Sequence, residues 1–129
     1  MIFYAYGHPN IRGTHKNTME FTKEEHLTPD GDCIIGVKAD FDTAKLTEFV
    51  RKHKRAKITL TANNVKDEFE ANLNPEFSDE KEVVIRIGEH VSPRTFAVRA
   101  DKAAKHLKRE LINELKNGAR LEIKLEEVQ

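Results

Sequence analysis

The sequence has only one cysteine, Cys33, and no tryptophan. A single cysteine cannot form an intrachain disulfide, which excludes the small disulfide-stabilised domains of secreted proteins. No apolar run approaches the roughly 20 residues that span a bilayer. The first residues, MIFYAYGHP, also lack the basic start of a signal peptide. We therefore expect a cytoplasmic protein that makes no contact with membranes.

The formal net charge is zero, because 22 basic residues balance 22 acidic ones. Proteins that coat nucleic acid or anionic membranes usually carry a basic excess, so the chain as a whole does not belong to that class. Low-complexity segments are absent, and apolar residues make up 38% of the chain. A chain of 129 residues with this composition is expected to form a single domain, 1–129.

Apolar spacing predicts many short strands and two helices. Strands are expected at 2–6, 17–22, 33–37, 57–62, 69–73, 83–87, 95–99 and 121–125. The first helix has its inward stripe at Leu46, Phe49 and Val50, and either Asp42 or Thr43 is a suitable N-cap. A clearer helical pattern runs from about 102 to 117, with Asp101 as its expected N-cap.

The two halves of the chain resemble each other. EHLTP at 25–29 matches EHVSP at 89–93, and VKAD at 37–40 matches VRAD at 98–101. The expected elements also follow in the same order, so we predict an internal duplication with pseudo-repeats at about 1–63 and 64–129. The predicted fold class is α+β: duplicated β-β-β-α-β units that form a mixed sheet or partly closed barrel with two helices. A ferredoxin-like βαββαβ core with extra strands is the alternative.

The segment GHPNIRGTHKNTMEF, residues 7–21, concentrates polar groups between two expected strands. His8, His15, Glu20 and the later Asp32 are all suitable ligands for zinc, iron or manganese. Their spacing matches no compact metal signature. The alternative is a polar turn in which His8 and Asn10 bond the local backbone. Because nothing like GHPN recurs in the second half, we expect a ligand-facing loop special to the first half.

Three further places are candidates for chemistry. Arg94 and Thr95 open a strand, and Lys102 would lie at the start of the second helix, where α/β proteins often bind anions. The basic run RKHKRAK at 51–57 has the charge to contact RNA phosphates, although cations also complement a helix C-terminus. Cys33 opens an apolar strand beside an acid, which favours a buried structural thiol over a nucleophile.

Two functions fit these residues, and they leave open whether the protein is an enzyme. The first is a binding module for a polar or phosphorylated ligand or for RNA. Its expected ligand-binding residues are His8, Asn10, Thr18, Arg94, Thr95 and Lys102. The second is a metal-assisted hydrolase or nuclease, with His8 and His15 as metal ligands and His15, Glu20 and Asp32 as catalytic candidates. The sequence indicates no particular cofactor or oligomeric state.

Several of these segments together resemble a known family. GHPNI, LTPDGDCIIGVKAD and RTFAVRADKAAKHL, with His15, Thr18 and Glu20, are similar to an archaeal family described as domain of unknown function 371. The resemblance covers essentially the whole chain. This sequence differs from the family pattern at 87–89, where the resemblance leads us to expect a more basic segment that contains serine. The resemblance implies an archaeal, cytoplasmic source and brings no established activity.

Overall fold

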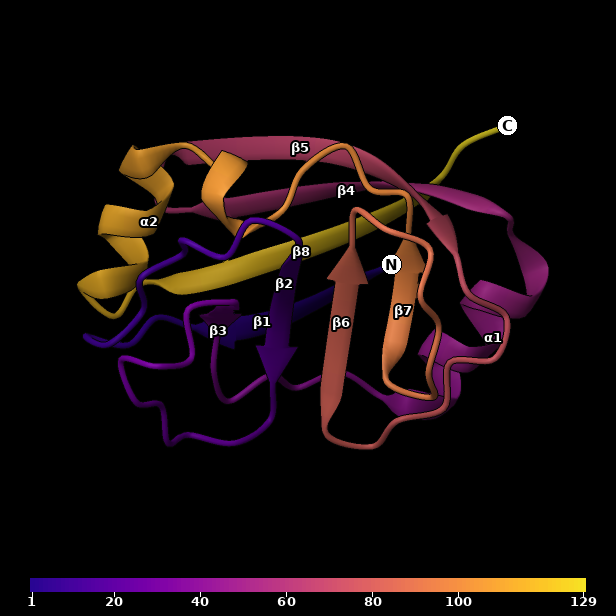
Figure 1. Ribbon diagram of the computed structural model, residues 1–129, viewed down its shortest axis with the longest axis horizontal. Coiled ribbons are helices and arrows are strands. Elements are labelled where there is room, and N and C mark those ends of the chain that lie inside the picture. The colour runs from indigo at the N-terminus through magenta and orange to yellow at the C-terminus, as the bar shows by residue number, and fades with distance from the viewer.

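Eight strands form one mixed sheet in the computed structural model, which describes residues 1–129, and two α-helices lie at its opposite ends (Figure 1). The elements in chain order are β1 (Ile2–Tyr6), β2 (Thr18–Thr22), β3 (Ile34–Gly36), α1 (Thr43–Lys52), β4 (Arg55–Ala62), β5 (Val65–Leu73), β6 (Glu82–Arg86), β7 (Thr95–Val98), the short 3₁₀ helix η1 (Ala104–His106), α2 (Arg109–Lys116) and β8 (Arg120–Glu127). The predicted α+β fold with a mixed sheet and two helices is confirmed. The ferredoxin-like alternative is wrong, because in that fold the strands before and after a helix flank one common strand, whereas β3 and β4 lie far apart in the sheet.

The strands are ordered β1-β8-β4-β5-β7-β6-β2-β3 across the sheet. The first four are antiparallel neighbours. In Figure 1, β1 and β8 pass behind β2, and β4 and β5 run along the top of the molecule. The two edges of the sheet meet at one isolated bridge. There the N–H groups of Tyr6 and Val37 each donate to the other residue's carbonyl, at 2.7 and 2.8 Å. The sheet is therefore strongly curled and open between β1 and β3 except at this bridge.

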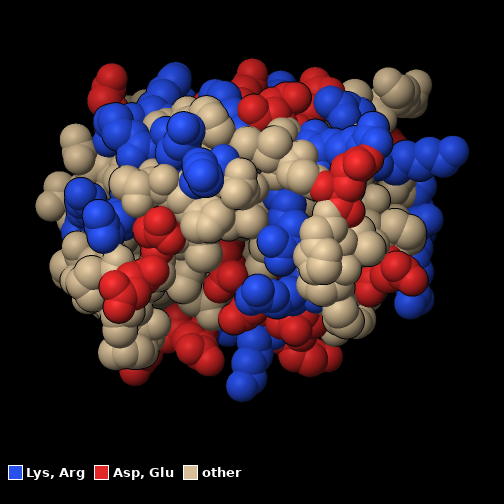
Figure 2. All heavy atoms as spheres, in the orientation of Figure 1, with Lys and Arg blue, Asp and Glu red and all other residues tan.

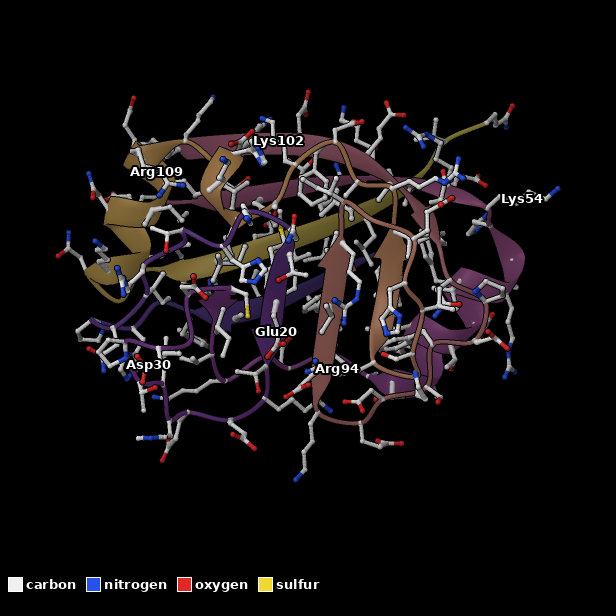
Figure 3. All side chains as sticks on the ribbon, viewed as in Figure 1. Glu20, Asp30, Lys54, Arg94, Lys102 and Arg109 are labelled. Atoms are coloured by element: carbon white, nitrogen blue, oxygen red, sulfur yellow. The ribbon has the colours of Figure 1, made fainter.

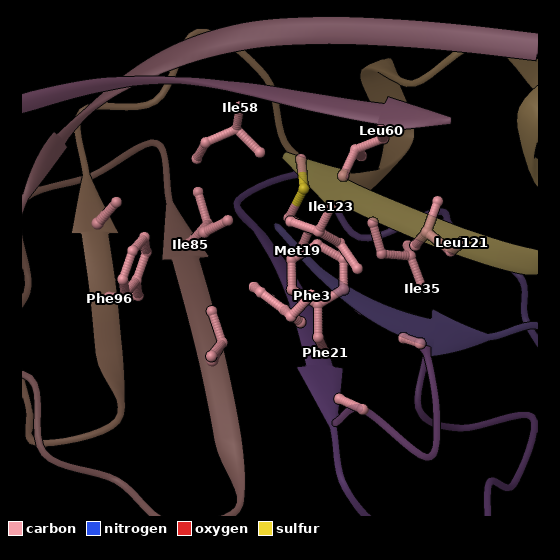
Figure 4. Close-up of a cluster of buried hydrophobic side chains, with 14 of the residues drawn as sticks. Phe3, Met19, Phe21, Ile35, Ile58, Leu60, Ile85, Phe96, Leu121 and Ile123 are labelled. Carbon is pink, nitrogen blue, oxygen red and sulfur yellow. The ribbon is translucent and has the colours of Figure 1, made fainter. Parts of the chain in front are cut away.

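The core lies between the two crossed sets of strands. It is one cluster of 33 buried apolar residues, part of which is shown in Figure 4. Phe3 and Phe21, from strands on opposite sides of the cluster, pack edge to face with ring centroids 5.8 Å apart. The helix α1 begins as predicted, because Asp42 Oδ1 accepts the N–H groups of Ala44 and Lys45. No helix in the protein has the length and apolar character needed to span a membrane.

The two halves pair their strands in the same way. β2 and β3 run parallel with a register shift after Glu20, and β6 and β7 run parallel with a register shift after Val84. β2 also pairs with β6, where Glu20 lies opposite Val84, and β4 pairs with β8, where Leu60 lies opposite Ile123. An approximate twofold axis therefore passes through these two pairs. The correspondence is compatible with duplication, which stays a prediction.

The repeated VKAD and VRAD segments have the same structural role in both halves: the aspartate of each accepts a backbone hydrogen bond from a strand. Asp40 Oδ1 accepts the N–H of Tyr4 at 2.7 Å, and Asp101 Oδ2 accepts the N–H of Glu70 at 3.0 Å. Each aspartate therefore fastens its segment to the strand that opens its own half. The prediction that Asp101 caps the second helix is wrong, because its carboxylate is used on β5.

The second helix also begins later than predicted. Residues 104–106 form a single 3₁₀ turn, Leu107 is extended at φ −69 and ψ 148, and α2 begins only at Arg109. The break is stabilised by the Arg109 guanidinium, which donates to the main-chain carbonyls of Ala104, Lys105 and Leu107. Apolar spacing could not reveal the break, because the extended Leu107 still reaches the core.

Candidate functional site

The first histidine of segment 7–21 closes a tight turn. His8 Nδ1 accepts the N–H of Asn10 at 3.0 Å. In the second half Asn74 Oδ1 accepts the N–H of Glu76 at 3.1 Å, so the sequence NPEF at 74–77 forms the counterpart of HPNI at 8–11. The GHPN sequence does not recur, but its turn does, because the same two hydrogen bonds form in both halves while the capping side chains differ. This turn is therefore not special to the first half. The alternative of a polar turn describes His8 better.

His15 makes a second turn of the same kind. Its Nδ1 accepts the N–H groups of Asn17 and Thr18, both at 3.1 Å. In the second half Asp79 Oδ2 accepts the N–H groups two and three residues further on, at 2.9 and 2.7 Å. A ring nitrogen that accepts backbone N–H groups has no free lone pair for a metal ion. Both histidines thus leave only Nε2 available to a ligand.

The residues of the metal hypothesis do not surround one point. No group of three or more His, Cys, Asp or Glu side chains is placed to hold a metal ion. Asp32 holds the loop through its main chain, where its carbonyl accepts the N–H groups of Thr14 and His15 at 3.1 and 3.3 Å. The centre of His8, His15 and Glu20 that the hydrolase alternative requires is therefore not formed.

Polar side chains do gather on the outward face of β2. Met19 and Phe21 point into the core, so strand alternation turns Thr18, Glu20 and Thr22 outward. The three are nevertheless buried, and Glu20 is only 6% exposed. They are shielded because β2 lies inside the sheet, between β6 and β3.

The facing strand of the second half completes this surface. Arg86 lies opposite Thr18, and Glu82 lies opposite Thr22. Arg94, just before β7, reaches over both carboxylates: its Nη1 is 2.9 Å from Glu82 Oε2 and 3.6 Å from Glu20 Oε1. Figure 3 shows Glu20 and Arg94 close together on the front of the molecule. We call this surface the Glu20 face, and it consists of Thr18, Glu20, Cys33, Glu82, Arg86 and Arg94.

Burial dominates the electrostatics of the Glu20 face. It raises the pKa of Glu20 to about 7, with a further rise from Glu82 that Arg94 opposes. Burial also raises the pKa of Cys33, and the nearby carboxylates of Glu20 and Asp32 add to that rise. The thiol therefore stays protonated at neutral pH, which agrees with the expectation that Cys33 is not a nucleophile.

Thr95, on the strand next to β6, holds one arginine of the Glu20 face in place. It is fully buried, and its Oγ1 accepts the N–H of Ser92 at 3.2 Å and the Nε–H of Arg86 at 3.3 Å. The contact orients the Arg86 guanidinium, and the terminal nitrogens of that side chain make no hydrogen bond within the protein. Thr95 thus positions an arginine and has no surface of its own to offer a ligand.

Three residues expected in the binding site lie elsewhere. His8 lines a polar hollow of about 480 Å³ together with Glu25, His26 and Lys38. Asn10 Nδ2 donates to the carbonyl of Leu27 at 2.8 Å. Lys102 Nζ donates to Asp67 near α2. The six expected ligand-binding residues are therefore not brought together in one site.

Sequence reasoning missed Glu82 and Arg86. A signal for them existed, because aligning the two halves makes these residues the equivalents of Thr18 and Thr22. In a protein whose halves meet at a twofold axis, equivalent strands near the axis become neighbours. Residues that align with a candidate site are then candidates for the same site.

The basic run at 51–57 is largely neutralised by ion pairs. Lys52 pairs with Glu48, Arg55 with Glu70, and Lys57 with Glu68. His53 Nδ1 also lies 2.8 Å from Glu127 Oε2. These contacts leave only Arg51 and Lys54 of this run without an acidic partner, which weakens the case for RNA contacts here.

An eight-stranded mixed sheet of two equivalently paired halves, with a polar face where they meet, defines the class of this protein. The family model described as "Domain of unknown function (DUF371)" matches residues 3–128. Uncharacterized protein MJ0206 of Methanocaldococcus jannaschii is 37% identical over 130 residues, with 96% of each chain covered. The chain belongs to the DUF371 family, and the resemblance to an archaeal family is confirmed.

Proposed function

We propose that the protein is a binding module that holds a small polar ligand, with a phosphate or similar anionic group, on the Glu20 face. The observation that carries this proposal is the environment of the Glu20 carboxyl. Its side chain is 9% exposed, and its nearest cationic atom, Arg94 Nη1, is 3.6 Å away. No hydrogen bond from the protein reaches the carboxyl oxygens. Burying an acid in this way costs free energy, and sites that keep such a cost are frequently functional.

The two arginines supply the complement to an anionic group. Arg94 contacts the protein's carboxylates through Nη1 alone, and its side chain is 47% exposed. Arg86 donates to Thr95 through Nε, so its terminal N–H groups remain available. Two guanidinium groups, from the end of β6 and from the residue before β7, suit the several oxygens of a phosphate. Glu20 can then hydrogen-bond a hydroxyl or ring nitrogen next to that phosphate.

The charge of Glu20 links ligand binding to pH. Because its pKa is about 7, the carboxyl is part protonated at neutral pH and repels an incoming anion only weakly. Deprotonation at higher pH adds a negative charge beside the anionic group. We therefore expect affinity to fall between pH 6 and pH 8 for the wild-type protein. In Glu20→Gln this fall should be absent, and only the second ionisation of the phosphate itself should change the affinity over this range.

A ligand screen by thermal shift, followed by calorimetry, tests the proposal. The panel consists of nucleoside phosphates, sugar phosphates and inorganic phosphate. Arg86→Gln and Arg94→Gln should each weaken binding about tenfold or more, because each removes a charge-assisted hydrogen bond. Arg99→Gln is the matched control, since Arg99 is an exposed arginine that pairs with Glu89 outside the Glu20 face. Failure of every compound to bind, or an equal loss in the control, would contradict the proposal.

A further inference from the structure

A second charged surface lies around η1 and the first turn of α2. Seven basic residues gather there from three segments of the chain: Arg12, Lys16, Lys66, Lys102, Lys105, Lys108 and Arg109. We call this the cationic surface. Figure 2 shows basic side chains clustered over the end of the molecule where Figure 1 places α2 and η1.

Main-chain contacts hold the three segments together. The N–H of Lys105 donates to the carbonyl of His15 at 3.0 Å, which joins η1 to the loop at 12–16. Arg109 Nη1 donates to the carbonyl of Gly13 at 3.0 Å, which joins the same loop to α2. A Cβ at Gly13 would lie 2.6 Å from Ile112 Cδ1, so the loop packs directly on the helix. These contacts hold the loop at 12–16, η1 and α2 in fixed positions relative to one another, together with the positive charges that they carry.

A third set of contacts joins the start of β5 to these segments. Lys108 Nζ donates to the carbonyl of Lys66 at 2.8 Å, and the N–H of Lys108 donates to Asp67 Oδ2 at 2.9 Å. Asp67 also accepts a hydrogen bond from Lys102 Nζ, and its side chain is only 2% exposed. Asp67 therefore fixes the position of the two lysines and presents almost no negative charge to solvent.

The cationic surface is not neutralised as the run at 51–57 is. Of its seven members only Lys102 forms an ion pair. Within its three segments, 12–16, 66–67 and 102–110, seven basic residues stand against two acidic ones, Asp67 and Glu110, and the rest of the chain has fifteen basic and twenty acidic residues. Glu68 and Asp101 border the surface next to Asp67 and Lys102. A neutral chain therefore carries a strongly positive end, and local potential rather than net charge governs the attraction of polyanions.

We propose that the cationic surface docks the phosphodiester backbone of a nucleic acid without reading its sequence. Several cations spread over three segments of the chain suit a polymer with repeated phosphates better than a single small anion. No exposed Phe, Tyr or Trp adjoins any of the seven residues in the sequence, and His106 beside Lys105 is the one exposed ring among them, so we assign the binding to phosphate contacts. The Arg109 N–H groups bond main-chain carbonyls, so this residue contributes charge, while the exposed lysines make the contacts.

Fluorescence anisotropy with labelled strands tests this proposal. The probes are single-stranded RNA, duplex RNA and duplex DNA of one sequence and ~20 nucleotides, titrated at 50 to 200 mM salt. The wild-type protein should bind, and log K should fall linearly with log salt concentration. Comparison of the three probes shows whether RNA or DNA is preferred.

Two variants with equal charge change provide the control. Lys16→Glu/Lys105→Glu alters exposed members of the cationic surface whose side chains have no protein partner, and it should weaken binding about tenfold or more. Arg51→Glu/Lys54→Glu makes the same change at the end of α1 and should weaken binding far less. Equal losses in the two variants would overturn the proposal, because they would show a response to net charge alone.

Two other results would also overturn it. One is the absence of binding to all three probes at 50 mM salt. The other is binding to phosphatidylglycerol vesicles with no binding to nucleic acid, which would make the surface a membrane contact. The proposal does not depend on the Glu20 face. Glu20→Gln should leave nucleic-acid affinity unchanged, so failure of one proposal is distinguishable from failure of the other.

Discussion

At the scale of single residues, His8 and His15 show how a side chain suited to chemistry can serve the backbone. Each uses Nδ1 to accept N–H groups in a turn, at 3.0 to 3.1 Å. The second half uses Asn74 and Asp79 for the same purpose. Different side chains can therefore occupy these positions, provided that each carries an acceptor atom at the distance that the turn requires.

This interchange predicts the behaviour of two His15 variants. His15→Ala removes the acceptor of two N–H groups and should lower the free energy of unfolding by about 1–2 kcal/mol. His15→Asp installs the side chain that Asp79 uses in the second half and should recover most of that loss. Urea unfolding at pH 7.5 measures both. Equal destabilisation by the two substitutions would show that His15 matters for something besides its turn.

Unlike His15, which stabilises a turn, Glu20 lowers the stability of the folded protein, because its buried carboxyl costs free energy when it is charged. In the unfolded chain it loses its proton near 4.5, whereas the folded protein holds that proton up to a pKa of about 7. Between these values the folded state binds more protons, so the free energy of unfolding falls as pH rises through this window. Above pH 7 the full cost of the buried charge is present.

Glu20→Gln should therefore stabilise the protein at high pH and not at low pH. Because glutamine cannot ionise, we expect a gain on the order of 2 kcal/mol at pH 8 and little change at pH 4. Thermal or urea unfolding at the two pH values measures the difference. Glu76→Gln, at an exposed glutamate, is the control and should have no effect at either pH. A gain of the same size at both pH values would contradict this account.

At the scale of elements, the exit of β1 touches the end of α2. The N–H of Gly7 donates to the carbonyl of Ala119 at 2.8 Å. A Cβ built on Gly7 would lie 1.9 Å from the carbonyl oxygen of Leu115, which belongs to the helix backbone. Only glycine lets these two main chains approach so closely, and this contact places the loop at 8–16 over α2.

Gly7→Ala should destabilise the protein by about 3 kcal/mol, since neither backbone can move without disturbing β1 or α2. Gly88→Ala is a matched control, because nothing lies within 4 Å of a Cβ at Gly88. It should change stability by less than about 0.5 kcal/mol. Differential scanning calorimetry compares the two variants. A tolerated alanine at residue 7 would mean that β1 and α2 can separate without cost.

At the scale of the whole molecule, charge is balanced in number and separated in space. The chain has no net charge, yet its cationic surface lies around η1 and α2, and outside the segments of that surface twenty acidic residues outnumber fifteen basic ones. Such a distribution creates a strong local potential that a charge count does not show.

We therefore expect the protein to be retained on a cation-exchange resin at pH 7.5 and low salt, despite its formal net charge of zero. Lys16→Glu/Lys105→Glu should elute at a lower salt concentration than Arg51→Glu/Lys54→Glu, although the two variants have the same net charge. Co-elution of the two variants would show that the resin responds to total charge, in which case the cationic surface has no special potential.

Most of the secondary structure and its order along the chain could be predicted from the sequence. Alternation predicted most strands, helical spacing and Asp42 predicted α1, and the matched EHLTP and EHVSP segments predicted two halves with one element order. These features depend on neighbours in the chain, which a sequence records directly. The break before α2 escaped prediction because Arg109 stabilises it through carbonyls that no spacing pattern identifies.

What the sequence by itself determined, then, is the order of strands and helices, the family, and the residue types available for a site. The tertiary structure alone decided which of them meet. Glu20 lies opposite Val84 and under Arg94 because β2 and β6 pair across the axis between the halves, and Lys16 lies beside Lys105 because η1 bonds the loop at 12–16. Strand pairing depends on long-range packing of the core, and side-chain periodicity along one strand does not specify its neighbour.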